Sequence, residues 1–308
     1  MRIVCFGEIL WDVAGGVEYL GGAPLNFASC MTRLGNEAVL LSAVGRDDRG
    51  EKALHWMKES GLDIELVETK SLHRTGVAVV STDQSGNTNF VIERPAAFDF
   101  INLGGPTLSR LVEFSPQWIY FGTLAQTATS TEAALKRLVM ELPGTRRFYD
   151  VNLRDGHWNR DLVRRLSRLA HIIKLNDLEA ETLFGFDHPL ERFSLEAFCS
   201  EWSRSCGCTT ICVTRGEAGC SIWHDKALHT FPGFRVEVVD TVGAGDAFSA
   251  GFLHGLGLGW RLDKAARFAN GLGAIVASRP GAIPLWTMDE CLRLIESQTP
   301  DYCADSYD

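Results

Sequence analysis

The sequence predicts an α/β fold with a largely parallel sheet, and two observations lead to this prediction. Short runs of β-branched or apolar residues alternate along the chain with segments of helical periodicity, which is the pattern of βαβ units. The chain has 308 residues, of which 45% are hydrophobic and 22% charged. A soluble chain of this length and composition can bury a core without disulfides or metal.

The elements follow from these local patterns in chain order. The expected strands are Ile3–Phe6, Ala38–Ser42, Trp118–Phe121, Arg147–Val151, Ile172–Leu175 and Thr210–Val213. The helices expected between them include Pro24–Leu34, Gly50–Ser60, Thr131–Glu141 and Arg160–Leu169. Two apolar helices are expected near the C-terminus, at Gly245–Leu256 and Leu262–Ser278, and the polar end Gln298–Asp308 is expected to fray.

One region departs from the alternation of strands and helices. Two strand-like runs, Gly76–Thr82 and Asn89–Glu93, flank the turn-like segment Asp83–Asn87, which predicts an antiparallel hairpin. Such a hairpin could extend the main sheet or form a lid over a ligand, and the sequence leaves both readings open.

Charge and cysteine usage narrow the class of protein. The net charge is −9 and no Lys/Arg-rich run occurs, so no nucleic-acid partner is expected. The nine cysteines include no C-x-x-C pair, which argues against a zinc or redox motif and favours reduced thiols in the cytoplasm. The N-terminus lacks the features of a signal peptide and no long apolar run occurs, so no membrane contact is expected.

The segment around Asp246 is the most informative for chemistry. A strand-like run, Val236–Asp240, leads to Gly243-Ala244-Gly245 and then directly to a helix. Small residues at a helix start let backbone amides approach an anion such as a phosphate. Asp246 in the first turn could then accept a hydroxyl proton. An ordinary first-turn acid is the alternative. Phe248 occupies the third glycine position of a dinucleotide fingerprint, and no P-loop motif occurs.

The segment Asp240-Thr-Val-Gly-Ala-Gly-Asp-Ala-Phe-Ser-Ala-Gly-Phe252 resembles the C-terminal signature of the PfkB-type carbohydrate kinases, in the ribokinase superfamily. The segment Gly21–Ala28, followed by Gly35 and Gly45, is similar to the N-terminal signature of the same family. The resemblance extends to about Gly281. It implies an ATP-dependent sugar kinase with a ribokinase-like three-layer sandwich, a mainly parallel central sheet and a small β lid. Residues 1–308 would form one kinase domain, with lid strands within about 8–20 and 74–101.

The resemblance also implies roles for residues of the sugar site. Asp246 would be the general base, and the backbone of Gly243, Ala244 and Gly245 would hold the transferred phosphoryl group. The sugar would contact a set of residues from both ends of the chain: Asp12, Gly21, Gly22, Asn26, Phe98 and Asp246. Polar groups of this kind discriminate between sugars, because a missing partner leaves them buried and unpaired. Without the resemblance, Asp12 reads as a turn residue and Asn26 as a polar residue at a helix start.

Three further segments resemble the nucleotide-binding parts of the family. They are Asp150–Arg154 (D-x-N-x-R), Asn176–Glu179 (N-x-x-E) and Thr214–Gly219 (T-x-G-x-x-G), although the second also reads as a helix cap and the third as a β-turn. The implied ATP contacts are Asn152, Arg154, Lys174, Asn176, Thr214, Gly216, Gly219, Asn270 and Ala274. Glu179 would reach Mg²⁺ through water, and the carbonyls of Asp240, Val242 and Gly281 would hold a monovalent cation, K⁺.

The identity of the sugar depends on details of these signatures. Gly21-Gly22-Ala23-Pro24-Leu25-Asn26 resembles fructokinases and 2-keto-3-deoxygluconate kinases and departs from the G-G-K-G-A-N form of ribokinases. Gly7–Asp12 and Glu93–Asp99 point toward fructokinases, and Arg94 is the one obvious lid residue for the carboxylate of a sugar acid. Fructose is therefore expected, with ketodeoxygluconate or another sugar as the alternative. A non-catalytic sugar- or nucleotide-binding regulator and a Rossmann-type oxidoreductase are less favoured.

The lid of this family suggests two further expectations. A closed lid should exclude water, because an open ATP site would hydrolyse ATP. The lid strands could also form the interface of a homodimer.

Overall fold

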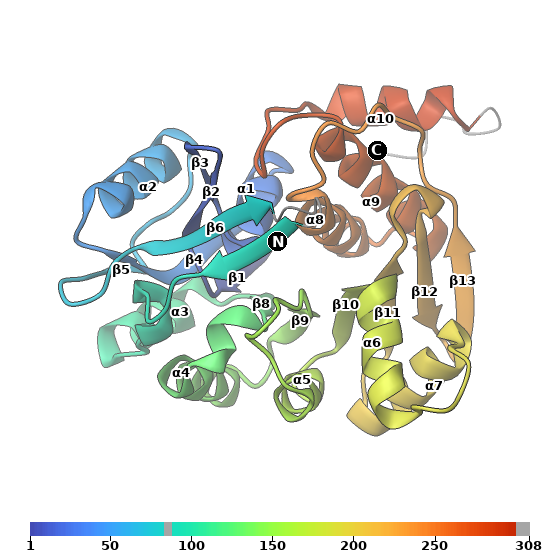
Figure 1. The fold of residues 1–308 in the computed structure, drawn as a ribbon, viewed down its shortest axis with the longest axis horizontal. Helices are drawn as coiled ribbons and strands as arrows, with labels where there is room; N and C mark the ends of the chain where they lie inside the picture. Colours follow the sequence, from blue (N-terminus) through green and yellow to red (C-terminus); the bar gives the residue numbers. More distant parts are fainter. Residues whose placement is uncertain (83–87, 300–308) are drawn as a thin grey trace.

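The main structural unit is a nine-stranded sheet in the order β13-β12-β11-β10-β9-β8-β1-β4-β5 (Figure 1). The computed structural model describes residues 1–82 and 88–299. From β5 to β11 the neighbouring strands run parallel, while β12 and β13 continue the sheet antiparallel. The strands are β1 (Arg2–Phe6), β4 (Glu37–Gly45), β5 (Val67–Lys70), β8 (Trp118–Gly122), β9 (Arg146–Asp150), β10 (Ile172–Asn176), β11 (Thr210–Thr214), β12 (Cys220–His224) and β13 (Ala227–Phe231). The predicted mainly parallel α/β fold is confirmed.

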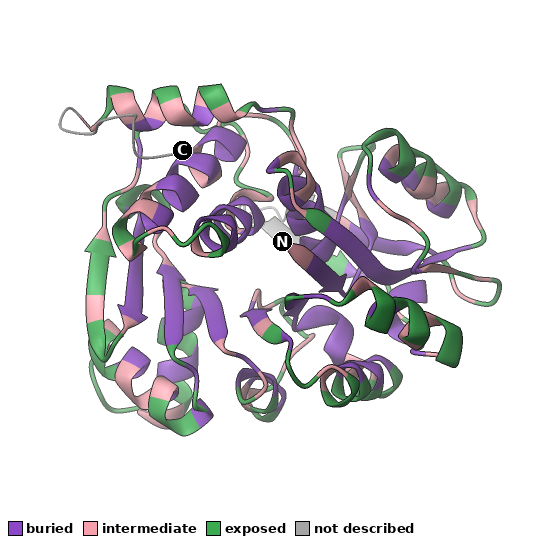
Figure 2. Ribbon diagram, turned by 180° about the vertical axis from the view of Figure 1, so that it is seen from behind, coloured by how far each residue is buried: buried purple, intermediate pink, exposed green. Residues whose placement is uncertain are grey.

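Helices cover both faces of this sheet. One face carries α1 (Ala23–Arg33), α2 (Asp48–Glu59), α8 (Ala244–Gly257), α9 (Leu262–Ala277) and α10 (Met288–Ser297). The other face carries α3 (Gly105–Phe114), α4 (Thr129–Glu141), α5 (Arg160–Ser167), α6 (Asp177–Asp187) and α7 (Leu195–Cys206). Alternate residues of each strand point to opposite faces: Ile3 of β1 joins the first core and Val4 the second. The central strands are therefore buried on both sides, while the edge strands β5 and β13 are partly exposed (Figure 2), and the arrangement is a three-layer sandwich.

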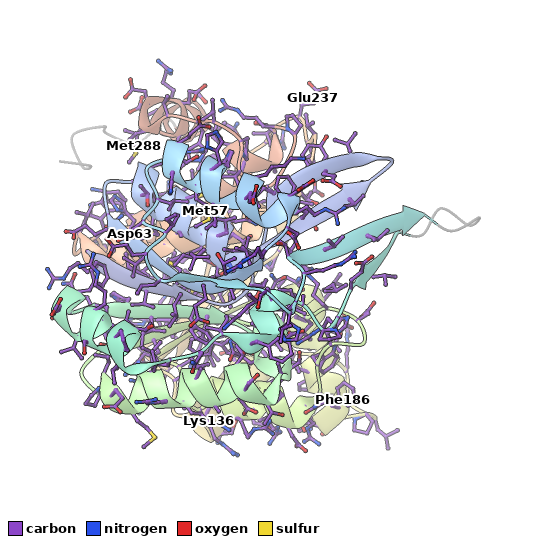
Figure 3. The ribbon with its side chains drawn as sticks, turned by 90° about the vertical axis from the view of Figure 1, so that its left-hand side faces the viewer. Met57, Asp63, Lys136, Phe186, Glu237 and Met288 are labelled. Atoms are coloured by element: carbon purple, nitrogen blue, oxygen red, sulfur yellow. The ribbon has the colours of Figure 1, made fainter. Side chains whose placement is uncertain are left out.

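A second, smaller sheet has the order β3-β2-β6-β7, and we call it the small sheet. Its strands are β2 (Leu10–Ala14), β3 (Val17–Gly21), β6 (Gly76–Thr82) and β7 (Thr88–Ile92). Figure 3 shows its blue and teal strands reaching out from the body of the molecule. The predicted hairpin is confirmed as β6 and β7, and it joins β2 in this separate sheet instead of extending the large one. The predicted turn at Asp83–Asn87 lies outside the described residues.

The expected strands and helices are present with ends shifted by a few residues, but one expectation is wrong. The strand-like run Val236–Asp240 forms no strand. The side chains of Val238 and Val239 are 60% and 57% exposed. The amides of Val239 and Asp240 donate to the carbonyl of Ala277 at the end of α9, at 2.9 and 3.2 Å. These two amides thus bond to the end of a helix, and not to a neighbouring strand as the prediction required.

The C-terminal segment that was predicted to fray begins with a residue that is held in place. Gln298, the first residue of the segment predicted to fray, exchanges two hydrogen bonds of 2.8 Å with the backbone of Arg235. Residues 300–308 are outside the described part of the chain.

The cysteines serve packing in the described structure. Eight of them lie in the described residues, and all eight are buried free thiols. Burial raises the pKa of Cys199 and Cys208 to about 12, so these thiols behave as small apolar side chains. Within the described residues, 1–82 and 88–299, no helix is both long and apolar enough to cross a membrane.

Candidate active site

The candidate site lies at the carboxyl ends of the parallel strands. From β1 the chain passes through α1 to β4 on one side, and from β8 it passes through α4 to β9 on the other. The chain connections therefore diverge between β1 and β8, which are neighbours in the sheet. Open α/β sheets bind their ligands outside the strand ends at such a point. The residues discussed below come from the loops and helix starts at this edge.

The start of α8 presents backbone amides without intramolecular partners. Gly243 caps the helix with φ 80°, and a Cβ there would collide with the backbone carbonyl of Ala282, so the position requires glycine. The amide of Ala244 donates to Thr241 at 3.2 Å. Among the described residues, nothing accepts a hydrogen bond from the amides of Gly245 and Asp246. Free amides at the positive end of a helix can bind an anion.

Asp246 stands beside these amides and is paired across the fold. Its side chain is 7% exposed, and its carboxylate accepts a hydrogen bond of 2.8 Å from the amide nitrogen of Asn26 in α1. Burial raises the pKa of Asp246 to about 7, helped by the neighbouring Asp150 and opposed by Lys174. A carboxyl group with such a pKa can accept a proton at neutral pH.

A buried polar network supports the start of α8 from below. Asp150, at the end of β9, is fully buried and accepts hydrogen bonds from Lys174 (3.1 Å), Ser249 (2.9 Å) and Tyr120 (3.1 Å). Ser249 lies one turn along α8 from Asp246. The network therefore fixes the helix that carries Asp246 to strands β8, β9 and β10.

Lys174 places a positive charge under the free amides. Its ammonium nitrogen lies 2.8 Å from the position that a Cβ on Gly245 would take. Burial would lower the pKa of Lys174, but the carboxylates of Asp150, Glu179 and Asp246 raise it above the usual value. The ammonium group thus stays charged next to the predicted phosphoryl position.

Three of the predicted sugar-site residues converge from different elements. A Cβ on Gly21 would lie 3.0 Å from the carboxylate of Asp12 on β2 and 3.7 Å from the amide oxygen of Asn26 on α1. Burial raises the pKa of Asp12 to about 6. The Asn26 side-chain oxygen is buried and has no hydrogen-bond partner in the described part of the chain. Gly22, at φ 113°, packs against the carbonyl of Glu8 where no side chain would fit.

The surroundings of two other predicted residues bear on their roles. Arg154 was assigned to ATP, and its exposed guanidinium counteracts the rise in pKa that burial causes at Glu8, Asp12 and Asp246. Its charge therefore also acts on carboxyl groups of the predicted sugar site. Phe98 was assigned to the sugar, but its ring is fully buried and packs against Gly76, so it presents no surface to a ligand in this conformation.

The N-x-x-E segment forms a capping box at the start of α6. The Asn176 side chain accepts from the amide of Glu179, and the Glu179 carboxylate accepts from the amide of Asn176, both at 2.8 Å. The other Glu179 oxygen accepts from the amide of Leu153 at 2.6 Å, beside the predicted Asn152, which has φ 40°. Glu179 therefore braces two loops and, at 8% exposure, could reach a metal ion only through water.

The T-x-G-x-x-G segment is a tight turn between antiparallel strands. Thr214 ends β11, and η3 (Gly216–Ala218) leads into β12. Gly216 and Gly219 have φ values of 54° and 83°, which favour glycine. A Cβ on Gly219 would collide with the backbone of residues 231–233.

The residues predicted to line the adenine site contact the same segment, residues 231–233. Asn270 on α9 is buried and donates to the carbonyl of Pro232 at 2.9 Å, and Ala274 lies one turn further along the helix. The structure thus brings the turn at 214–219 and the α9 residues together around residues 231–233.

The three residues predicted to hold a monovalent cation lie together next to Gly243. The Asp240 carboxylate accepts hydrogen bonds from the amides of Val242 and Gly281, each at 3.0 Å. In the part of the chain that the structure describes, no group of three or more His, Cys, Asp or Glu side chains is arranged to hold a metal ion.

Sequence reasoning missed the buried carboxylates around this site. Asp150 lay within the D-x-N-x-R segment, but only Asn152 and Arg154 were assigned roles. Glu8 is 4% exposed and one of its oxygens has no partner among the described residues. Burial raises the pKa of Glu8, while Arg154 and Arg94 lower it. An acidic residue at the end of a strand, Asp150 in β9, or two residues after it, Glu8 after β1, was the available signal.

Comparisons with known proteins agree with this geometry. Residues 2–288 match the family described as pfkB family carbohydrate kinase. Fructokinase-1 of Oryza sativa subsp. japonica is 30% identical, over 96% of this chain and 98% of its own length. The fructokinase of Solanum tuberosum is also 30% identical, over 96% of this chain and 95% of its own.

Solved structures share the fold over nearly the whole chain. The fructokinase of Xylella fastidiosa with bound ATP superposes with a TM-score of 0.85 at 23% identity, covering 97% of this chain and 99% of that one. A double mutant of the fructokinase of Vibrio cholerae O395, in a form that binds fructose, ADP and a potassium ion, gives a TM-score of 0.82 at 23% identity, with coverages of 96% and 98%.

Proposed function

Because the chain belongs to the pfkB family of carbohydrate kinases, we propose that it transfers the γ-phosphoryl group of ATP to a hydroxyl group of fructose. Curated relatives at 29–30% identity, each covered nearly to its full length, are fructokinases. The contact between Asp246 and Asn26 at the start of α8 is the observation that carries the proposal, because it sets a buried base beside free backbone amides.

In the proposed reaction the Asp246 carboxylate accepts the proton of a sugar hydroxyl. The hydroxyl oxygen then forms a bond to the γ-phosphorus of ATP, and the bond from that phosphorus to the β,γ-bridging oxygen breaks. The phosphoryl group passes to the sugar, and ADP leaves with the electron pair of the broken bond. Asn26 holds the carboxylate in place through its 2.8 Å hydrogen bond.

Charge that develops on the phosphoryl group would meet fixed positive groups. The amides of Gly245 and Asp246 point from the helix start, and the Lys174 ammonium lies directly beneath them. The exposed Arg154 guanidinium adds a further positive charge that acts on Asp246. Such preorganised groups stabilise a transition state more than they stabilise the substrate.

ATP would lie between the turn at Thr214–Gly219 and α9, close to Asn270 and Ala274. Mg²⁺ would be held mainly by the phosphates of ATP and by water. Because the Glu179 carboxylate already accepts hydrogen bonds from two backbone amides, it would contact the ion through water. When bound, the ion would neutralise phosphate charge. Two adjacent loops, one that contains Asp240 and Val242 and one that contains Gly281, would hold a monovalent cation through the carbonyl groups of these residues.

The small sheet would act as a lid, since Asp12 on β2 forms part of the sugar site. The small sheet also exposes three apolar side chains, Val17, Tyr19 and Val91, which could be covered by a second copy of the chain in the predicted homodimer. Size-exclusion chromatography with light scattering would test this proposal.

The test is an assay of ADP release with ATP and separate fructose, ketodeoxygluconate and ribose, with the products identified by mass spectrometry. We expect fructose to give the highest kcat/KM. Asp246→Asn should lower kcat by about 10²–10⁴-fold. Asp263→Asn is the matched control, because Asp263 also lies in the first turn of a helix, α9, but away from the site. Equal losses in both variants, or no phosphorylation of any sugar by the wild type, would contradict the proposal.

A further inference from the structure

We propose that Asp99 makes the sugar site selective for uncharged sugars, because it occupies the Arg94 guanidinium that would otherwise receive the carboxylate of a sugar acid. The inference rests on the proposed sugar kinase function and names the class of substrate that the site accepts. It assigns a specificity-determining role to an ion pair outside the catalytic residues.

Most N–H groups of Arg94 already have partners inside the protein. Its Nε donates to one carboxylate oxygen of Asp99 at 3.1 Å, and one terminal nitrogen donates to the other oxygen, so the pair is bidentate. The second terminal nitrogen donates to the carbonyl of Leu124 at 3.2 Å and to the hydroxyl of Thr127. The Arg94 side chain is 16% exposed and that of Asp99 6%. A ligand carboxylate would have to displace a buried carboxylate to bind here.

Asp99 is held rigidly in this position. It belongs to the short helix η1 (Ala97–Phe100), and its carboxylate also accepts from the amide of Ala96 at 2.9 Å. Its backbone carbonyl accepts from the hydroxyl of Ser130 at 2.6 Å. The neighbouring Phe98 ring lies under the Arg94 guanidinium, 5.4 Å from its centroid. Arg94 is therefore fixed on four sides and cannot swing toward a ligand without breaking several contacts.

The Arg94–Asp99 pair lies at the edge of the sugar site. Leu124 and Thr127 belong to η2 (Leu124–Thr127), which follows β8, and β8 is the neighbour of β1. Glu8 follows β1, and both Arg94 and Arg154 oppose the rise in its pKa that burial causes. Arg154 in turn affects Asp12 and Asp246 in the same way. A chain of electrostatic neighbours thus connects Arg94 with the catalytic base.

The other charged groups of the proposed sugar site are mainly acidic. Glu8, Asp12 and Asp246 are buried or half-buried carboxyl groups, and the charge of Arg154 lowers the pKa of all three. A substrate carboxylate would meet these like charges, and the nearby cations already have carboxyl partners: Lys174 is paired with Asp150, Arg94 with Asp99, and Arg154 interacts with the three carboxyl groups above. A neutral polyol needs only hydrogen bonds from the same groups. Discrimination between the two substrate classes therefore comes from keeping the Arg94 guanidinium paired with Asp99, not from an additional contact with the sugar.

The experiment compares Asp99→Asn with the wild type in kcat/KM for ketodeoxygluconate and for fructose. Asparagine keeps the shape and an acceptor for Ala96 but removes the charge, so Arg94 can accept a new anionic partner. We expect the acid-to-fructose ratio of kcat/KM to rise at least about tenfold, with fructose itself changed less than about threefold. The double variant Arg94→Gln/Asp99→Asn should return the ratio to the wild-type value, because the free guanidinium is gone.

Asp47→Asn is the matched control. Asp47 is also an acid held by internal hydrogen bonds, from the amides of Gly50 and Thr75 and from the hydroxyl of Thr75, and none of the described cations forms a salt bridge with it. Its substitution should leave the acid-to-fructose ratio unchanged. A purely structural role of Asp99 would lower the activity with both substrates together and would not move the ratio.

An unchanged ratio in a folded, active Asp99→Asn variant overturns the inference, as does a gain that persists in the double variant. If circular dichroism shows that Asp99→Asn does not fold, the wild type decides. It must prefer fructose over ketodeoxygluconate by at least about a hundredfold in kcat/KM, and a smaller preference overturns the inference. Failure of the proposed function is a different result, in which wild-type protein releases no ADP with fructose. Any neutral sugar that is phosphorylated then takes the place of fructose in the ratio.

Discussion

Asp246 has to meet two opposing physical demands. As the proposed base it must lose its proton, yet it is only 7% exposed, and burial disfavours the charged form. Asp150 next to it adds a like charge, whereas Lys174, Arg154 and the hydrogen bond from Asn26 favour ionisation. The balance leaves its pKa at about 7, within the range where a general base is most effective.

The pH dependence of activity should follow this one carboxyl group. We expect kcat/KM for the sugar, at saturating ATP, to rise about tenfold per pH unit below about 7 and to level off above it. Stability should change in the opposite direction. A raised pKa in the folded state stabilises the protein below the unfolded pKa, and this contribution is lost as the pH rises through about 7.

The measurement is kcat/KM from pH 5.5 to 8.5 in buffers of constant ionic strength. A profile that is flat between pH 6 and 8 would show that another group controls the proton transfer.

At the level of single elements, the start of α8 depends on contacts with every neighbouring layer. Gly243 packs against the carbonyl of Ala282, and Ser249 is bonded to Asp150 in the large sheet. Asp246 is bonded to Asn26 in α1. The helix start is therefore held on three sides before any ligand binds, which is the preorganisation that phosphoryl transfer requires.

Gly243→Ala should damage this helix start. The residue has φ 80°, where a Cβ is disfavoured by about 1–2 kcal/mol, and its Cβ would also collide with the Ala282 carbonyl. We expect a lower Tm and a fall in kcat of at least about tenfold, because the free amides move. Gly259→Ala controls for backbone strain, since Gly259 has φ 74° and open space around its Cβ position. Equal effects of the two substitutions on kcat would refute a special role for the α8 start.

At the level of the whole molecule, the proposed sugar site joins two sheets that have separate cores. Asp12 belongs to the small sheet, whereas Asn26 and Asp246 belong to helices on the large sheet. The small sheet is linked to α2 by the Trp11 indole, which donates to the Arg49 carbonyl at 3.1 Å. The Arg49–Glu18 salt bridge of 2.6 Å is a second link. A sugar bound between the sheets would add a third connection and favour closure.

Sugar binding should therefore raise Tm, and the increase should require Asp12. At fructose concentrations near 100 Kd the stabilisation is about 2.7 kcal/mol, which corresponds to several degrees in Tm for a chain of this size. Asp12→Ala should abolish the shift. Glu18→Gln on the adjacent strand β3 should preserve it, because Glu18 pairs with Arg49 and has no contact with the sugar site. Differential scanning fluorimetry measures both variants, and an undiminished shift in Asp12→Ala would place the sugar elsewhere.

Several features of this protein could be predicted from short stretches of its sequence. Alternating apolar runs predicted the parallel strands, and the spacing of Asn176 and Glu179 predicted a capping box that forms with both of its hydrogen bonds. The small residues before Asp246 predicted a helix start with free amides. These features depend on neighbours within a few positions along the chain, so their energies are set by nearby residues.

The run Val236–Asp240 shows the limit of this reasoning. Its β-branched residues favour a strand, but the carbonyl of Ala277 at the end of α9 accepts the amides of Val239 and Asp240 instead. The sequence offered Arg94 as the one obvious lid residue for the carboxylate of a sugar acid, and in the structure Asp99 and η2 occupy its side chain. In both cases the partner was chosen by packing and not by the segment's own composition.

The chain's own residues thus specified the α/β class, the two signatures and the position of the proposed base, because each is a short-range pattern of shape and polarity. Folding specified the pairs that act at a distance: Asn26 with Asp246, Lys174 beneath Gly245, and Asp150 beneath Ser249. Asn26 and Asp246 are 220 positions apart. Contacts of this kind depend on how complete layers pack, and no local pattern of residues encodes that arrangement.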